Sequence, residues 1–124
     1  MYWFLGKKSS LSLENKLLLY KVIIKPIWTY GIELWGCCSK SNVNINQRFQ
    51  SKTLRMLAGA PWYVSNQTLH VDLSTTTVED ERQKRVDKYF QRLQEHGNQL
   101  AINFVDVRNP KRFKRIWPCD LRAE

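Results

Sequence analysis

The sequence is poor in acidic residues, above all in its first half. Eleven Asp and Glu stand against twenty Lys and Arg in 124 residues, which gives a formal net charge of +9. Residues 1–71 contain only two acids, Glu14 and Glu33, and these are far apart in the sequence. Two-metal phosphoryl or nucleotidyl transfer requires carboxylates that converge on hard cations. We therefore predict no catalytic residue, no metal site and no cofactor in this chain.

Cysteine and histidine are also scarce. Of the three cysteines, Cys37 and Cys38 are adjacent, which suits neither a disulfide framework nor the spacing of a zinc knuckle. His70 and His96 each lack a potential metal ligand at a suitable spacing, so we interpret both as core or surface residues. No signal peptide opens the sequence, which predicts a reducing, intracellular location, either nucleus or cytoplasm.

The chain has no long uncharged hydrophobic run. Its most apolar stretch, residues 17–36, is interrupted by Lys21, Lys25 and Glu33. A bilayer span needs about 20 predominantly apolar residues. This stretch is therefore predicted to be a core segment, and no membrane is expected as a partner.

Glycine and proline are few, five and four respectively, and the apolar pattern is helical. The first helix is predicted to begin after Ser10 or Ser12, and Pro26 either kinks it or starts a second helix that ends near Gly36. Its predicted buried stripe, at helical spacing, is Leu13, Leu17, Tyr20, Ile24 and Trp28, widened by Leu19, Ile23 and Ile27.

Two more long helices are predicted. One covers about residues 43–58, capped by Ser41 or Asn42 and ended by Gly59, with an apolar face of Ile45, Phe49, Thr53, Met56 and Leu57. The other starts at a capping box over residues 76–79 and stops near Gly97, with a buried arc of Val78, Val86, Tyr89, Phe90 and Leu93. Short helices are expected from a cap at Asn66 through Asp72, and from a cap at Asn98 to about Val105.

These elements predict an all-α fold, a small bundle of three longer helices plus short ones. We assign residues 1–107 to this helical domain and residues 108–124 to a basic tail. The apolar residues Tyr2 to Leu5 either follow a preceding part of a longer polypeptide or dock on the first helix. The tryptophans Trp28, Trp35 and Trp62, together with Tyr63, are predicted to belong to the core.

The basic residues suggest a polyanionic partner. Arg48, Lys52 and Arg55 fall at i, i+4 and i+7, so they can follow phosphates along one helical face. A second candidate set for nucleic-acid binding lies in the tail: Arg108, Lys111, Arg112, Lys114 and Arg115. Its aromatic residues Phe113 and Trp117 can stack on bases. The alternative for both sets is a solvated surface that contacts nothing.

The acids of residues 79–81 have a structural interpretation. Successive helical residues diverge by about 100°, so these side chains cannot converge on one ion. Acids in a first helical turn favour the positive end of the helix dipole. Arg82 projects into the apolar arc of the same helix, and we expect it either to extend its charged end to solvent or to pair with a nearby acid, without a functional role.

Several motifs resemble one family. The string Lys25-Pro26-Ile27-Trp28-Thr29-Tyr30-Gly31, preceded by Ser12-Leu13-Glu14-Asn15-Lys16-Leu17, is similar to reverse transcriptases of insect jockey-type retrotransposons without long terminal repeats. Three later motifs agree with it: Gln50-Ser51-Lys52-Thr53-Leu54-Arg55, then Ala60-Pro61-Trp62-Tyr63 with Leu69-His70, then Tyr89 with Arg92-Leu93 and His96. The resemblance covers nearly the whole chain.

The resemblance implies a C-terminal segment that follows the palm of an RNA-directed DNA polymerase, in the place of a thumb and its extension. The parent enzyme uses Mg²⁺, but its fingers and palm, with the Asp-Asp metal motif, have no counterpart here. The implied role is to grip the RNA/DNA template-primer duplex, with the missing palm and fingers as protein partners. The alternative is a non-catalytic helical module for protein interaction or structure.

Overall fold

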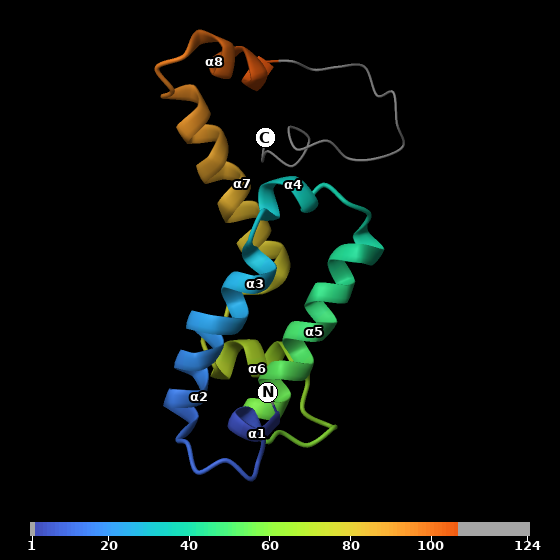
Figure 1. Ribbon diagram of the computed structural model, residues 1–124. Coiled ribbons are helices and arrows are strands. Elements are labelled where there is room, and N and C mark those ends of the chain that lie inside the picture. Colours follow the sequence, from blue (N-terminus) through green and yellow to red (C-terminus); the bar gives the residue numbers. More distant parts are fainter. Residues whose placement is uncertain (1, 107–124) are drawn as a thin grey trace.

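The computed structural model describes residues 2–106, and every regular element in that range is a helix (Figure 1). In order, the elements are α1 (Tyr2–Leu5), α2 (Leu13–Leu19), the π-helix η1 (Tyr20–Ile24), α3 (Lys25–Thr29), α4 (Ile32–Trp35), α5 (Lys40–Ala58), α6 (Asn66–Asp72), α7 (Val78–Gln94) and α8 (Gln99–Asp106). The predicted all-α class is confirmed. The predicted basic tail lies outside the described residues.

The elements α2, η1 and α3 run on without a break and form one rod (Figure 1). Ser12 caps its start, as predicted, by accepting a hydrogen bond from the Asn15 N–H. The π-helical turn comes directly before Pro26, which has no N–H to donate and whose ring crowds the preceding turn. There the Lys25 N–H donates to the Tyr20 carbonyl, five residues back, which widens the turn. The rod ends at Gly31, whose φ of 63° is left-handed, and the short α4 follows.

The rod buries a narrower stripe than its sequence predicts. Tyr20, Ile24 and Trp28 are buried, as expected. Three residues that were also assigned to the buried side are exposed: Leu13, Ile23 and Ile27. The reason is that the other elements pack against only the side of the rod that carries Tyr20, Ile24 and Trp28.

Helix α5 begins at Lys40, three residues earlier than predicted, with Ser39 in the N-cap position instead of Ser41 or Asn42. Gly59 ends it in a left-handed conformation, as predicted. The predicted apolar face is wrong in part, because Ile45 and Phe49 are exposed. The residues that α5 buries are Val43, Gln50, Ser51, Thr53, Leu54 and Leu57.

Polar residues of α5 turn inward because they bind the segment between α6 and α7. The Gln50 side chain donates to the Thr76 carbonyl over 2.8 Å. Gln47 accepts from the Val78 N–H over 2.9 Å and lies 3.1 Å from Nε2 of the buried His70. The other ring nitrogen of His70 lies 2.9 Å from the Thr75 carbonyl. His70 is thus a core histidine, one of the two placements predicted for it.

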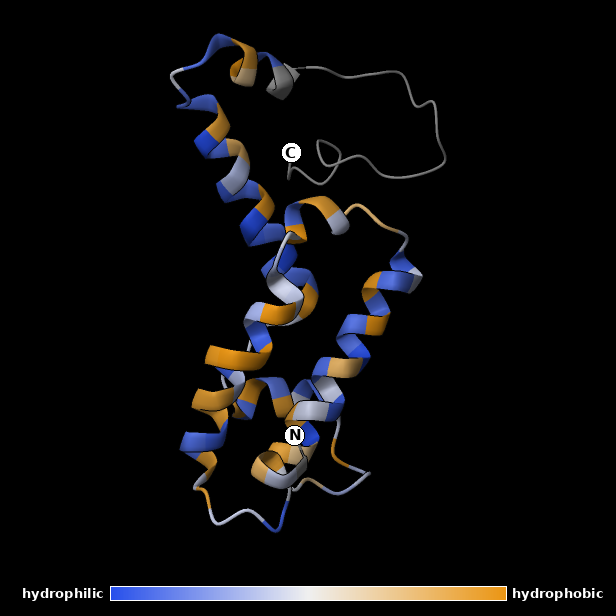
Figure 2. Ribbon diagram, in the orientation of Figure 1, coloured by the Kyte–Doolittle hydropathy of each residue, from blue (hydrophilic) through white to orange (hydrophobic). Residues whose placement is uncertain are grey.

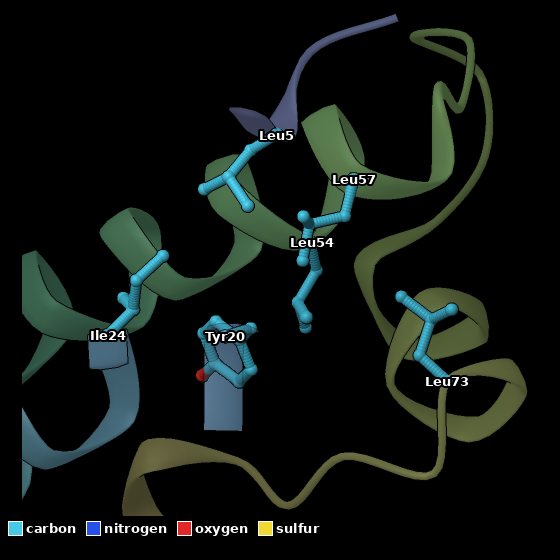
Figure 3. Packing of buried hydrophobic residues seen from close by; sticks show 6 residues of the cluster. All are labelled: Leu5, Tyr20, Ile24, Leu54, Leu57 and Leu73. Atoms are coloured by element: carbon cyan, nitrogen blue, oxygen red, sulfur yellow. The ribbon is translucent and has the colours of Figure 1, made fainter. Parts of the chain in front are cut away.

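The apolar core consists of three clusters. The largest joins the rod to the end of α5 and to Leu73, which follows α6, and Figure 3 shows its buried members: Leu5, Tyr20, Ile24, Leu54, Leu57 and Leu73. A second cluster contains Trp28, Ile32, Val43 and Val78, and a third contains Val86 and Phe90 of α7. Leu5 therefore docks on the first long helix, one of the two expectations for the N-terminal residues.

Helix α7 starts at Thr77, whose hydroxyl accepts from the Asp80 N–H, so the cap is one residue later than the predicted capping box. Its side chains Val78, Val86 and Phe90 are buried, whereas Tyr89 is partly exposed. Arg82 donates to the Gly36 carbonyl over 2.8 Å and pairs with Glu79, which confirms the expected pairing with an acid. Ser65, and not Asn66, caps α6, while Asn98 caps α8 as predicted.

Candidate nucleic-acid interface

The exposed side of α5 carries the cations that the sequence singled out. Arg48 and Lys52 are both exposed, one helical turn apart. Neither side chain takes part in an ion pair or hydrogen bond within the part of the chain that the structure describes. Ile45 and Phe49 lie exposed beside them. This side of α5 is therefore both cationic and partly apolar, with its charges available to a ligand.

Arg55, the third predicted cation, has a structural task as well. Its guanidinium donates to the carbonyls of Pro61 and Val64 over 2.6 and 2.7 Å, and to Oδ1 of Asn66 over 2.9 Å. These bonds tie the connector of residues 60–65 to the end of α5. The guanidinium keeps its charge, so a phosphate contact by Arg55 stays a prediction. Its hydrogen-bonding groups, however, are largely committed to the connector.

The connector presents two aromatic side chains to solvent. Trp62 is 89% exposed and Tyr63 is 73% exposed, so their predicted core placement is wrong. Trp28 is buried and Trp35 is half-buried. The rings of Trp62 and Tyr63 meet edge to face, with centroids 6.0 Å apart. The pattern of aromatic residues gave no sign of this exposure, because only the course of the connector decides it.

Helix α7 carries a second row of cations that the sequence analysis passed over. Lys84, Lys88 and Arg92 fall at i, i+4 and i+8, and all three are exposed. Within residues 2–106 none of the three forms an ion pair. The spacing alone could have revealed this row, as it did on α5. It was hidden because residues 64–107 as a whole contain seven acids and only five basic residues.

The acids at the start of α7 have three different tasks. Glu79 pairs with Arg82, and Asp80 accepts a hydrogen bond from the Thr77 hydroxyl over 2.7 Å. Glu81 is buried and binds Lys25 of the rod over 2.8 Å and Arg85 over 3.0 Å. Burial alone would raise the pKa of the Glu81 carboxyl, but the bonds from Lys25 and Arg85 outweigh it and lower this pKa. The contacts show the structural role predicted for these acids.

The Mg²⁺ that the resemblance implies for the parent enzyme does not fit the residues present here. No group of three or more His, Cys, Asp or Glu side chains converges within the described part of the chain. Glu14 lies exposed on α2 and Glu33 lies partly buried on α4, so the two acids of the first half belong to separate helices. No catalytic step can be derived through a metal at this surface. None of the described helices has the length and apolarity that crossing a bilayer demands.

Within residues 2–106, fold and surface together define an all-helical segment with rows of exposed cations and no converging carboxylates. Neither a family model nor a solved structure matches the chain. A probable RNA-directed DNA polymerase from transposon X-element of Drosophila melanogaster is 43% identical over 97% of this chain and 13% of its own length. The corresponding probable polymerase from transposon BS is 38% identical over 91% of this chain and 12% of its length. The RNA-directed DNA polymerase from mobile element jockey is 38% identical over 98% of this chain and 14% of its length.

These similarities confirm the resemblance read from the motifs. The chain belongs to the RNA-directed DNA polymerases of jockey-type and related mobile elements, as one segment of such a polymerase. It spans between 12% and 14% of the length of the curated relatives it matches.

Proposed function

We propose that this segment grips the template-primer duplex during RNA-directed DNA synthesis, in the position of a thumb, and contributes no catalytic residue. The observation that carries this proposal is the pair of free, exposed cations Arg48 and Lys52 on one face of α5. No acid occurs between Glu33 and Asp72, so nothing in the sequence of that region offsets their charge. Such a face binds the phosphate backbone and is indifferent to base sequence.

The test is a salt titration of binding to an RNA-DNA duplex. Each phosphate that the chain neutralises contributes about 0.9 to the slope of log affinity against log salt. Replacing Arg48 and Lys52 together by Gln should therefore reduce that slope by about 1.8 and weaken binding equally for all duplex sequences. Adding Arg55→Gln should reduce the slope further by clearly less than about 0.9, because this guanidinium is occupied by the connector.

A matched control removes the same charge elsewhere. The double variant Lys84→Gln and Lys88→Gln on α7 lowers the net charge equally but leaves α5 intact. If the α7 variant loses affinity and slope while the α5 variant keeps both, the assignment to α5 is wrong. The predicted tail contacts are tested in the same way with Arg112, Lys114 and Arg115 changed to Gln.

We further propose that the remainder of the polymerase polypeptide is a protein partner of this segment. Four apolar side chains of the rod are each about half exposed or more: Leu18, Val22, Ile23 and Ile27. Figure 2 shows much more hydrophobic colour on the rod than on α7. Exposed apolar residues that are rimmed by charged ones, here Lys21 and Lys25, are typical of a protein–protein contact. The curated relatives are several times longer than this chain, which provides the covering polypeptide.

A groove of about 540 Å³ includes one of these apolar side chains, Ile23, and is lined also by Trp3 and Phe4. The test is binding of the 124-residue chain to a jockey polymerase from which the matching segment has been deleted. The variant Val22→Asn with Ile27→Asn should abolish binding, whereas Ile45→Asn, an equally exposed change on α5, should not. Self-association of the chain through the same residues, or binding to lipid vesicles instead, would contradict this proposal.

A further inference from the structure

Trp62 and Tyr63 are the least expected side chains on the surface. Large aromatic rings bury 150–250 Å² when they enter a core, so leaving two neighbouring rings in water forgoes much of the hydrophobic gain of folding. Trp62 is nevertheless 89% exposed and Tyr63 73% exposed. Exposed aromatic residues of this kind are typical of binding surfaces.

The connector that carries them is braced from both sides. Arg55 donates to the carbonyl before the pair, that of Pro61, and to the carbonyl after it, that of Val64. The Val64 N–H donates in turn to the Pro61 carbonyl over 3.3 Å, which closes a turn around the two aromatic residues. Ser65 then caps α6 directly after the turn. The rings are thus held by a loop whose backbone is already hydrogen-bonded, so a ligand that binds them loses little free energy to ordering the backbone.

The surroundings of the pair are cationic. The Arg55 guanidinium lies 2.6 Å from the Pro61 carbonyl, directly before Trp62 in the chain. Lys52 precedes Arg55 by one turn of α5 and is exposed. The Lys7 side chain reaches the start of the connector, where its Cε is 3.2 Å from the place that a Cβ of Gly59 would occupy. The row of cations on α5 therefore ends at the aromatic pair.

We propose that Trp62 stacks on an unpaired base of the nucleic acid, with Tyr63 supporting it edge to face. This inference rests on the proposed function and assigns the single-stranded part of the substrate to the connector. Aromatic rings at the end of a cationic track are the arrangement by which proteins bind single strands, since every base offers a π-face and every phosphate a charge. The Trp62 ring packs edge to face with Tyr63 and is 89% exposed, so most of it is accessible to a base.

The experiment compares two probes at several salt concentrations: a blunt RNA-DNA duplex, and the same duplex with a six-nucleotide single-stranded RNA extension. The unaltered chain should bind the extended duplex more tightly. Trp62→Ala should remove that preference, by about five- to hundred-fold for one stacked base. The salt slope on the blunt duplex should not change, because stacking releases no counterions. Trp62→Phe should restore part of the preference.

Tyr30→Ala is the matched control, since Tyr30 is 86% exposed but lies between α3 and α4, away from the connector. It should leave both probes unaffected. If the unaltered chain binds both probes equally with a normal salt slope, the stacking inference is wrong while the duplex contact stands. If only the extended probe binds, stacking is supported and the duplex grip is refuted. Loss of affinity for the truncated polymerase in Trp62→Ala, with nucleic-acid binding unchanged, would assign the pair to a protein contact and overturn the inference.

Discussion

Truncation of Trp28 to Ala is expected to destabilise the chain strongly. Trp28 is 6% exposed and packs with Ile32, Val43 and Val78, so it joins the rod to α4, α5 and α7. Deleting a buried aromatic side chain removes its transfer free energy and leaves a cavity, which together cost about 3–5 kcal/mol. Since domains of this size are stable by about 5–15 kcal/mol in total, the variant should lose a large part of its stability.

The indole nitrogen of Trp28 refines this prediction. Nε1 is buried and faces the Tyr20 hydroxyl, but the two groups form no hydrogen bond of ordinary geometry. An unpaired buried donor costs free energy, about 1–3 kcal/mol. Trp28→Phe, which keeps an aromatic ring but deletes this donor, should therefore cost clearly less than Trp28→Ala.

Urea denaturation followed by circular dichroism measures both variants. The midpoint should fall for Trp28→Ala while the slope of free energy against urea stays the same. Trp62→Ala serves as the matched control, because that tryptophan is exposed and its removal should change the free energy of unfolding by less than about 0.5 kcal/mol. An unchanged midpoint for Trp28→Ala, or equal losses for the two tryptophans, would refute the packing that places Trp28 at the junction.

Three further predictions can be checked on the same chain. The pKa of Glu81 is lowered in the folded chain, so its ion pairs stabilise the fold above the pKa of an unfolded Glu, about 4.3, and this contribution disappears as the pH falls through the lowered folded pKa. The difference in stability between the unaltered chain and Glu81→Gln should therefore be full at pH 7 and shrink below about pH 4. A difference that grows in acid would contradict this prediction. Gly59→Ala should cost about 1–2 kcal/mol in urea denaturation, since φ is 60° at this residue, and an unchanged midpoint would show that another end to α5 is available. Finally, the purified chain should show no primer extension on a primed RNA template with Mg²⁺ or Mn²⁺, and metal-dependent extension by a clean preparation would disprove the absence of a catalytic role.

Local chemistry determined the helices and several of their ends. Ser12, Gly59 and Asn98 act in the structure as their residue types predict, because capping depends on one side chain and the few backbone groups next to it. Where neighbouring residues are equally good caps, as with Thr76 and Thr77, the sequence could not choose between them. The sequence also predicted that Pro26 disturbs the helix, but it did not predict that the disturbance takes the form of a π-helical turn.

Burial, by contrast, was decided by the tertiary structure. Ile27 and Phe49 have the spacing of core residues, yet they are exposed because no described element covers their side of the helix. Gln50 is fully buried instead, since the Thr76 carbonyl of another segment offers it a hydrogen bond. Periodicity shows which residues share a face, but it does not show which faces meet a partner.

Some features of the candidate nucleic-acid interface were likewise predictable from the sequence, whereas others depended on the tertiary structure. The sequence was sufficient to place Arg48 and Lys52 on one face, since helical geometry alone aligns residues four apart. Only the tertiary structure turned Arg55 toward the connector and exposed Trp62 and Tyr63, because both outcomes depend on the path of the chain between α5 and α6. Helix periodicity fixes relative directions within one element, whereas a side chain's partners across elements depend on how those elements pack.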